Sequence, residues 1–185
     1  MTTAIAPAAT STWKIDPAHS SVEFAVRHLM IATVRGRFGA LSGTVKGLDG
    51  GTTAPELDVS IDVATIDTRQ PQRDEHLRSA DFFDAARFPN ITFRARRVDG
   101  NLKGAFRIIG DLTIRGVTRE VVLDVESQGQ GADPWGGYRA GFSATGKLDR
   151  RDFGLTWNQL LEAGGFAVGD EIKITIDAEL TRQAA

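Results

Sequence analysis

Apolar and polar side chains alternate along much of the chain, and this period of two restricts the fold more than any other feature of the sequence. The clearest run is 56–67, where Leu57, Val59 and Ile61 are separated by aspartate and serine. Because successive side chains of a β-strand point to opposite faces, such a run predicts a half-buried strand. Turn residues separate eight runs of this kind, at 20–27, 34–46, 56–67, 90–98, 102–114, 119–128, 138–148 and 172–180.

One long segment between these runs has a different pattern. Alternation is lost over 69–88, where Pro71 suits the first position of a helix and Asp74 and Glu75 suit its first turns. We therefore predict one short helix in this segment. A second helical turn is expected at 158–163.

Eight strands with hairpin-like connections predict an all-β protein, either a sandwich or an antiparallel barrel. Closure into a lipocalin-like barrel removes the exposed sheet edges, and a barrel of eight strands holds either its own side chains or one small ligand. Within 34–46 the phase of alternation changes between Phe38 and Leu41. This change predicts a bulge or a sharp bend of the kind that lets a sheet close.

Two features of the predicted interior favour a cavity over a filled core. A run of about 12 residues corresponds to a strand of roughly 40 Å, which is longer than usual. Small residues on the inward phase leave room in the interior, namely Gly36, Gly43, Gly104, Gly110, Ala140 and Ala144. A tall, narrow, apolar interior would suit a long linear apolar ligand.

Charge and cysteine content exclude several classes of protein. The 22 Lys and Arg against 24 Asp and Glu give a net charge of −2, without the basic excess that nucleic-acid binding requires. Because the chain has no cysteine, it has no disulfide, thiol nucleophile or cysteine-ligated metal. We expect a flexible tail at 1–12 and a single domain at 13–182. No signal peptide and no stretch of the ~18 to 20 apolar residues that crosses a bilayer are found, so we expect a cytoplasmic protein without a transmembrane segment.

The sequence carries no motif for catalysis or metal binding. His19, His28 and His76 lack ligand spacing, and the triplet 152–154, Asp-Phe-Gly, lacks the other protein-kinase motifs that would give it a role. There is also no nucleophile elbow, phosphate-binding loop or dinucleotide fingerprint. We therefore expect no enzyme activity, no metal and no cofactor.

A series of short segments occurs in a characteristic order. They are Trp13-Lys-Ile-Asp16-Pro-Ala-His19-Ser20, Val22-Glu-Phe24-Ala-Val26-Arg-His28, Val34-Arg-Gly36-Arg-Phe38, His76-Leu-Arg-Ser79-Ala-Asp81-Phe82-Phe83-Asp84, Phe88-Pro89-Asn-Ile-Thr-Phe93, Gly110-Asp-Leu-Thr-Ile114-Arg-Gly116-Val-Thr118 and Arg151-Asp152-Phe153-Gly154-Leu155. Together they resemble the YceI-like polyisoprenoid-binding proteins over roughly 12–182. The resemblance implies an extended lipocalin-like barrel whose interior holds a long isoprenoid chain. Many members of that family carry a secretion signal that is not found here, so periplasmic or secreted roles are not implied.

The expected ligand-binding residues are mainly those of the inward phase and the aromatic residues that follow the helix. They are Phe24, Val26, His28, Phe38, Val59, Ile61, Phe82, Phe83, Phe93, Phe106, Ile108, Leu112, Phe142, Phe153, Leu155 and Trp157. Inward phase alone does not separate a cavity wall from a closed core, and the resemblance favours the wall.

Four residues are candidates for contact with a polar head group. His28 lies on the inward phase near a strand end, where it would either bond a head group or serve a structural role. Arg69, Arg73 and Arg78 flank the predicted helix, and guanidinium groups suit a pyrophosphate. The alternative is an exposed helix whose own carboxylates balance these arginines.

The leading hypothesis is a non-enzymatic carrier that sequesters or transports a polyisoprenoid or similar long-chain amphiphile, such as an isoprenoid quinone or its precursor. A second hypothesis is an enzyme that acts on a bound lipid with His28 as acid or base. A third is a filled barrel that serves as an interaction module in a stress response or as a homodimer.

Overall fold

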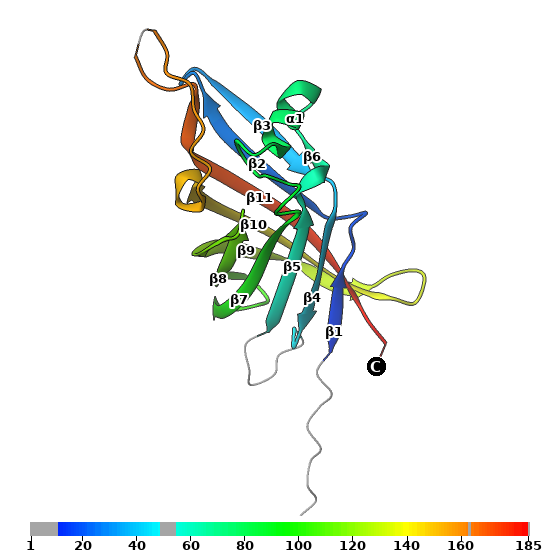
Figure 1. Cartoon of the computed structure of the whole chain (residues 1–185). Helices are drawn as coiled ribbons and strands as arrows, with labels where there is room; N and C mark the ends of the chain where they lie inside the picture. Colours follow the sequence, from blue (N-terminus) through cyan, green and yellow to red (C-terminus); the bar gives the residue numbers. More distant parts are fainter. Residues whose placement is uncertain (1–10, 49–54, 163, 185) are drawn as a thin grey trace, which may run out of the picture.

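The computed structural model describes residues 11–48, 55–162 and 164–184 (Figure 1). Within these ranges the elements are β1 (Thr12–Ile15), β2 (Ser21–His28), β3 (Ala32–Phe38), β4 (Leu41–Lys46), β5 (Glu56–Asp62), the 3₁₀-helix η1 (Val63–Thr65), β6 (Ile66–Asp67), α1 (Pro71–Arg78), β7 (Asn90–Gly100), β8 (Ala105–Ile114), β9 (Val117–Ala132), β10 (Tyr138–Asp149), the 3₁₀-helix η2 (Arg150–Phe153) and β11 (Val168–Arg182). The first strand includes Thr12, and residues 1–10 of the expected tail lie outside the described part.

The strands form a closed antiparallel barrel, as the sequence predicts. The ring runs β1-β4-β5-β7-β8-β9-β10-β11 and closes where β1 pairs with β11, with Ile15 opposite Leu180. Three further strands extend the sheet beyond β11 in the order β2-β3-β6. Each of these three strands continues the line of a ring strand. β2 continues β1, because both pair with β11, along different parts of it. β3 continues into β4, which follows it in the chain, and β6 continues β5, which precedes it. The eight runs of the sequence therefore correspond to eight strand positions around the barrel.

The break between β3 and β4 lies where the sequence changes phase. Phe38 ends β3 and Leu41 begins β4, and both are buried. In one regular strand, residues three positions apart would point to opposite faces, so the chain must bend between them. The side-chain oxygen of Thr65 accepts hydrogen bonds from the N–H groups of Gly39 and Ala40, at 3.1 and 3.2 Å. The predicted bend is confirmed, and a neighbouring side chain satisfies the backbone groups that it frees.

Several strands are much longer than usual. The hairpin of β9 and β10 has strands of 16 and 12 residues, and β11 has 15. At about 3.3 Å a residue, β11 measures roughly 50 Å along its path. The barrel is therefore elongated, as expected from the length of the alternating runs.

The predicted helix is present as α1, and the second helical turn is not. Pro71 is the first residue of α1, and the side chain of Gln70 accepts the N–H of Arg73 at 2.8 Å as the N-cap. The described part of 158–163 is an irregular loop, so that prediction was wrong. The amide of Asn158 bonds both the N–H and the C=O of Val168, which replaces the local bonds that a helical turn would need.

Apolar residues gather inside the barrel around Trp13, which is 0% exposed. A smaller apolar cluster joins Phe106 of β8, Val125 of β9 and Ala144 of β10. Among the described residues, no helix has the length and apolar character needed to cross a membrane.

Candidate functional site

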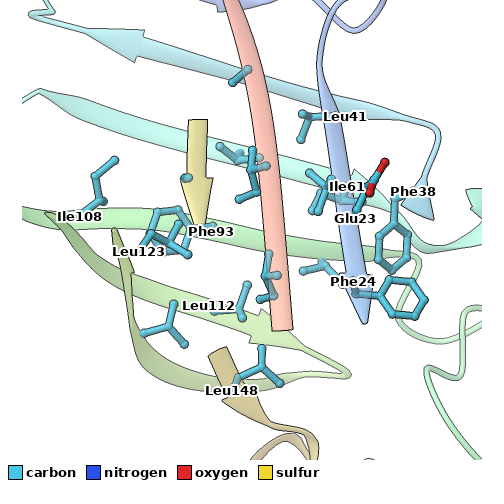
Figure 2. A pocket seen from close by; sticks show the side chains of 18 of the residues that line it. Glu23, Phe24, Phe38, Leu41, Ile61, Phe93, Ile108, Leu112, Leu123 and Leu148 are labelled. Carbon is cyan, nitrogen blue, oxygen red and sulfur yellow. The ribbon is translucent and has the colours of Figure 1, made fainter. Parts of the chain in front are cut away.

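The barrel interior contains an apolar cavity of about 280 Å³. Residues from all eight strand positions line it, and the side chains drawn in Figure 2 come from several strands. Its volume lies just below the usual range for small-molecule sites, which begins at about 300 Å³. The barrel is therefore not completely filled by its own side chains.

The cavity is elongated along the strands. Phe106 and Ile114 both line it and lie eight residues apart on β8, which corresponds to about 26 Å of strand. Near α1 the ring of Phe38 packs against Phe24 and Phe83, with centroids 5.7 and 6.0 Å apart. Toward the other end Phe106 meets Phe142 edge-on at 6.0 Å. Aromatic pairs therefore stand near both ends of one long apolar space.

Most residues of the predicted binding set lie in this wall. Those among the lining residues are Phe24, Val26, Phe38, Val59, Ile61, Phe82, Phe83, Phe93, Phe106, Ile108, Leu112, Phe142 and Leu155. Figure 2 shows Phe24 and Phe38 together, with Phe93 and Ile108 farther along the space. That these residues contact a ligand remains a prediction.

Three residues of the predicted set do not line the cavity. Phe153 is only 1% exposed and packs in the core, so it points inward without reaching the space. Trp157 lies edge-on to His76, with ring centroids 4.7 Å apart, and also packs on Phe82. His28 is the last residue of β2 and is paired with Val168, beyond the last lining residue of that strand. The residue opposite His28, Val168, does line the cavity, so contact of His28 with a ligand at this end stays a prediction.

The arginines around α1 also lie outside the cavity wall. Arg73 donates to the side-chain oxygen and the carbonyl of Thr68, at 2.7 and 2.8 Å. Arg78 donates weakly to the carbonyls of 64 and 66, and Arg69 is exposed at the start of the helix. The carboxylate of Asp74 is buried and accepts two bonds from Thr68 instead of balancing the arginines. The structure therefore gives Arg73 and Arg78 local structural bonds.

The interior glycines make room for neighbouring groups rather than for a ligand. A Cβ added at Gly36 would lie 2.3 Å from the Phe24 ring, and one at Gly110 would lie 2.6 Å from the Phe93 ring. Gly104 lies in the turn before β8 and outside the wall, so its expected place in the cavity was wrong. The space comes from the closed strands, and the glycines let two wall aromatics pack closely on the sheet.

Arg150, a charged residue absent from the predicted set, lines the cavity and is 3% exposed. Burial lowers its pKa because it removes the guanidinium from water. All five N–H groups have acceptors, which are the carbonyls of Leu155, Trp157, Val168 and Gly169 and the carboxylate of Asp170. The alternation of β10 continues to Arg150 on the inward phase, and this signal could have found it.

An ion-pair network joins the turn between β1 and β2 to the end of β11. Asp16, His19 and Glu179 bring ligand atoms within 4.8 Å of one another. Arg139 bonds both Asp16 and Glu179 and also reaches Asp133. Hydrogen bonds from His19 and Arg139 lower the pKa of Asp16 to about 2, and the bond to Asp16 raises the pKa of His19. A guanidinium thus already bridges the carboxylates where a cation would bind.

Comparison with known families gives a match to the YceI-like domain over residues 13–180. The chain belongs to the YceI-like family. It is 42% identical to the UPF0312 protein of Serratia proteamaculans over 153 residues, which cover 78% of this chain and 76% of that protein. It is 36% identical to a UPF0312 protein of Staphylococcus aureus over 167 residues, which cover 90% and 95%.

Solved YceI-like structures share the fold. The YceI protein of Campylobacter jejuni has a TM-score of 0.70 and 30% identity, over 85% of this chain and 90% of that one. Burkholderia cenocepacia BcnA has a TM-score of 0.76 at 23% identity, over 89% and 98%. A polyisoprenoid binding domain from Saccharophagus degradans has a TM-score of 0.61 at 17% identity, over 94% and 98%. The resemblance inferred from the short segments is confirmed.

Proposed function

We propose that the protein is a non-enzymatic carrier that holds one long-chain isoprenoid lipid, such as an isoprenoid quinone or its precursor, inside the barrel. The observation that carries the proposal is the elongated barrel cavity with an apolar wall. Burial of apolar surface contributes about 25 cal/mol per Å² before the costs of ordering a flexible chain. A long hydrocarbon chain in this space would therefore bind without any directional contact.

The family supports the choice of an isoprenoid among apolar ligands. One structural neighbour is named as a polyisoprenoid binding domain, and it shares the barrel over almost its whole length. An isoprenoid chain is long, narrow and apolar, as the cavity is. The proposal extends that binding property to this chain.

The chemistry of the wall supports holding a ligand rather than converting it. The described lining residues are apolar except for Glu23, Lys147 and Arg150, and they include no hydroxyl, thiol or imidazole group. The N–H groups of Arg150 already have acceptors, so this residue has no donor left to polarise a substrate. His28, the acid or base of the enzyme hypothesis, is not among the lining residues.

Native mass spectrometry of the purified protein, followed by organic extraction and mass analysis, tests the proposal. We expect one isoprenoid or long-chain amphiphile per chain, released intact after hours with the protein. A protein that is empty and also fails to take up added geranylgeraniol would contradict the proposal. A bound lipid that is converted over time, and is not converted by His28→Ala, would show an enzyme instead.

A pair of variants on β7 locates the ligand. Ala95 lines the cavity, whereas Thr92 is exposed on the other face of the same strand. We expect Ala95→Phe to weaken geranylgeraniol binding about tenfold or more because the ring occupies the space of the chain. Thr92→Phe should bind like wild type. Equal binding by both variants would place the ligand elsewhere.

A further inference from the structure

Large apolar side chains are exposed together at one end of the molecule. Three lie in the turn between β2 and β3, and two lie in the loop between η2 and β11. We call this set the tip patch: Leu29, Met30, Ile31, Leu160 and Phe166. Ile31 is 81% exposed and Leu160 is 72% exposed. Exposed apolar groups that gather in this way mark a surface for another apolar partner.

Backbone contacts hold the two halves of the tip patch together. The N–H of Leu29 donates to the carbonyl of Ala167 at 2.8 Å. Within the loop, Leu160 and Phe166 face each other as an antiparallel bridge. Figure 1 shows the β2–β3 turn and this loop at the same end of the molecule, away from the β9–β10 turn. The patch is therefore formed by two adjoining loop tips.

The tip patch directly continues the wall of the cavity. Val26 of β2 and Val168 of β11 both line the cavity. Leu29 lies three positions after Val26, and Val168 directly follows Ala167 at the end of the loop. The patch thus stands where the walls formed by β2 and β11 end.

The charge around the turn is basic, although the whole chain has a net charge of −2. No acidic residue occurs between Glu23 and Asp49, whereas Arg27 and Arg35 flank the turn. Arg27 donates to the carbonyl of Met30 at 2.6 Å, which holds its guanidinium at the tip. Arg35 makes no ion pair with any described residue. The loop on the other side contributes one carboxylate, that of Glu162.

We propose that the tip patch inserts into the surface of an anionic lipid bilayer and brings the end of the cavity to the membrane for lipid transfer. The proposal rests on the proposed carrier function. Exposed apolar tips flanked by arginines suit an interface where side chains enter the acyl boundary and cations meet anionic head groups. A second copy of the chain is a poorer partner, because a twofold contact through the turns would place these arginines against one another.

Site-specific labelling tests insertion directly, because the chain has no cysteine and one introduced thiol gives a single label. An environment-sensitive nitrobenzoxadiazole dye is attached to Ile31→Cys or, as the matched control, to Trp135→Cys. Trp135 is 84% exposed in the β9–β10 turn. The probe is vesicles of phosphatidylcholine and phosphatidylglycerol, with vesicles of phosphatidylcholine alone for comparison.

With anionic vesicles, we expect the fluorescence of the dye at position 31 to increase and its emission to shift to the blue. Both changes should be smaller with neutral vesicles or at high salt. The fluorescence of the dye at position 135 should stay unchanged. No response at 31, or an equal response at both positions, would overturn the proposal. So would a response at 31 that rises with protein concentration without vesicles, because that result would show a patch covered by a second copy.

A double variant separates membrane binding from ligand binding. Met30→Asp with Ile31→Asp should reduce flotation with anionic vesicles about tenfold or more. Uptake of geranylgeraniol from ethanol should stay unchanged, and Trp135→Asp should float like wild type. If the wild type takes up geranylgeraniol from ethanol but does not bind vesicles, membrane insertion is contradicted and the carrier function is not. Vesicle binding by a protein that never takes up lipid would remove the carrier function alone.

Discussion

At the scale of single residues, Arg150 shows how a charge is accommodated beside an apolar cavity. A buried cation is tolerated only where its hydrogen-bonding groups are satisfied. Four carbonyls of the 155–169 segment and one carboxylate surround this guanidinium. The residue therefore ties the loop before β11 to the end of β10, and its role is to position the wall.

Removing this guanidinium should destabilise the fold. We expect Arg150→Met to lower the free energy of unfolding by about 3 kcal/mol, because buried carbonyls lose their donors. Arg150→Lys should recover only part of the loss, since an ammonium cannot reproduce the planar fork. Urea denaturation measures both. The matched control is Arg151→Met, whose exposed guanidinium pairs with Asp149 and should cost less than about 1 kcal/mol. Equal losses at 150 and 151 would contradict this role.

The Asp16–His19 pair should make stability depend on pH. The pKa of His19 is raised in the folded protein, so its stabilisation is complete below the unfolded pKa of about 6.5 and is lost as the pH rises through the folded value. The pKa of Asp16 is lowered to about 2, so its stabilisation is present above about 3.9 and is lost as the pH falls toward 2. We expect the urea midpoint of the wild type to fall between about pH 6 and pH 8.

The control for this effect is His19→Gln, which keeps a polar side chain that does not titrate. Its urea midpoint should change less over the same interval of pH. Because His19 is exposed, high salt should also reduce the wild-type change. Identical pH profiles for the two proteins would show that another group is responsible.

At the scale of elements, alternation alone predicted the strands well, because each half-buried strand requires a period of two. It located the bend after Phe38 and seven of the eight ring strands, and it found β2 but did not predict β1. It also predicted most of the wall, since residues that share a face in a closed sheet share the interior. It did not show that the lining part of β2 ends at Val26, so it placed His28 in the wall. The network of Asp16 and Glu179 was missed because pairing between the two ends of the chain brings them together.

Two strands depend on glycine for close packing with an aromatic ring. In β3, a Cβ at Gly36 would meet the Phe24 ring at 2.3 Å and the Thr68 methyl at 2.8 Å. We expect Gly36→Ala to lower the free energy of unfolding by about 1 to 3 kcal/mol, because the ring must leave its place. Urea denaturation measures the loss. A neutral result would mean that the ring relaxes without cost.

The partner of this clash can be tested by a double-mutant cycle. Phe24→Leu removes the ring atoms that oppose the added methyl, so the double variant should be more stable than the sum of the two single changes predicts. Gly131→Ala is the control, because a Cβ there meets nothing within 4 Å. Strict additivity would assign the cost to the backbone instead.

At the scale of the whole molecule, the barrel closes where the short strand β1 near one chain end pairs with the long strand β11 near the other. β1 bonds both β4 and β11, and it carries the fully buried Trp13, which packs edge-on against Tyr138 at 6.0 Å. Because the sheet closes here, every ring strand has a partner on each side. The interior then has no route to solvent between strands of the ring, and a ligand must enter near an end.

A closed barrel with an apolar interior should be more stable when it holds its ligand. A ligand that binds only the folded state stabilises it by about 2.7 kcal/mol at one hundred times its Kd. For a chain of this size each kcal/mol raises Tm by about 2 to 4 °C, so we expect saturating geranylgeraniol to raise the Tm of delipidated protein by roughly 5 to 10 °C. Differential scanning calorimetry measures the shift. Ala95→Phe should show a much smaller shift because the ring fills the space. A shift of equal size in both proteins would mean that the lipid stabilises the outer surface and not the cavity.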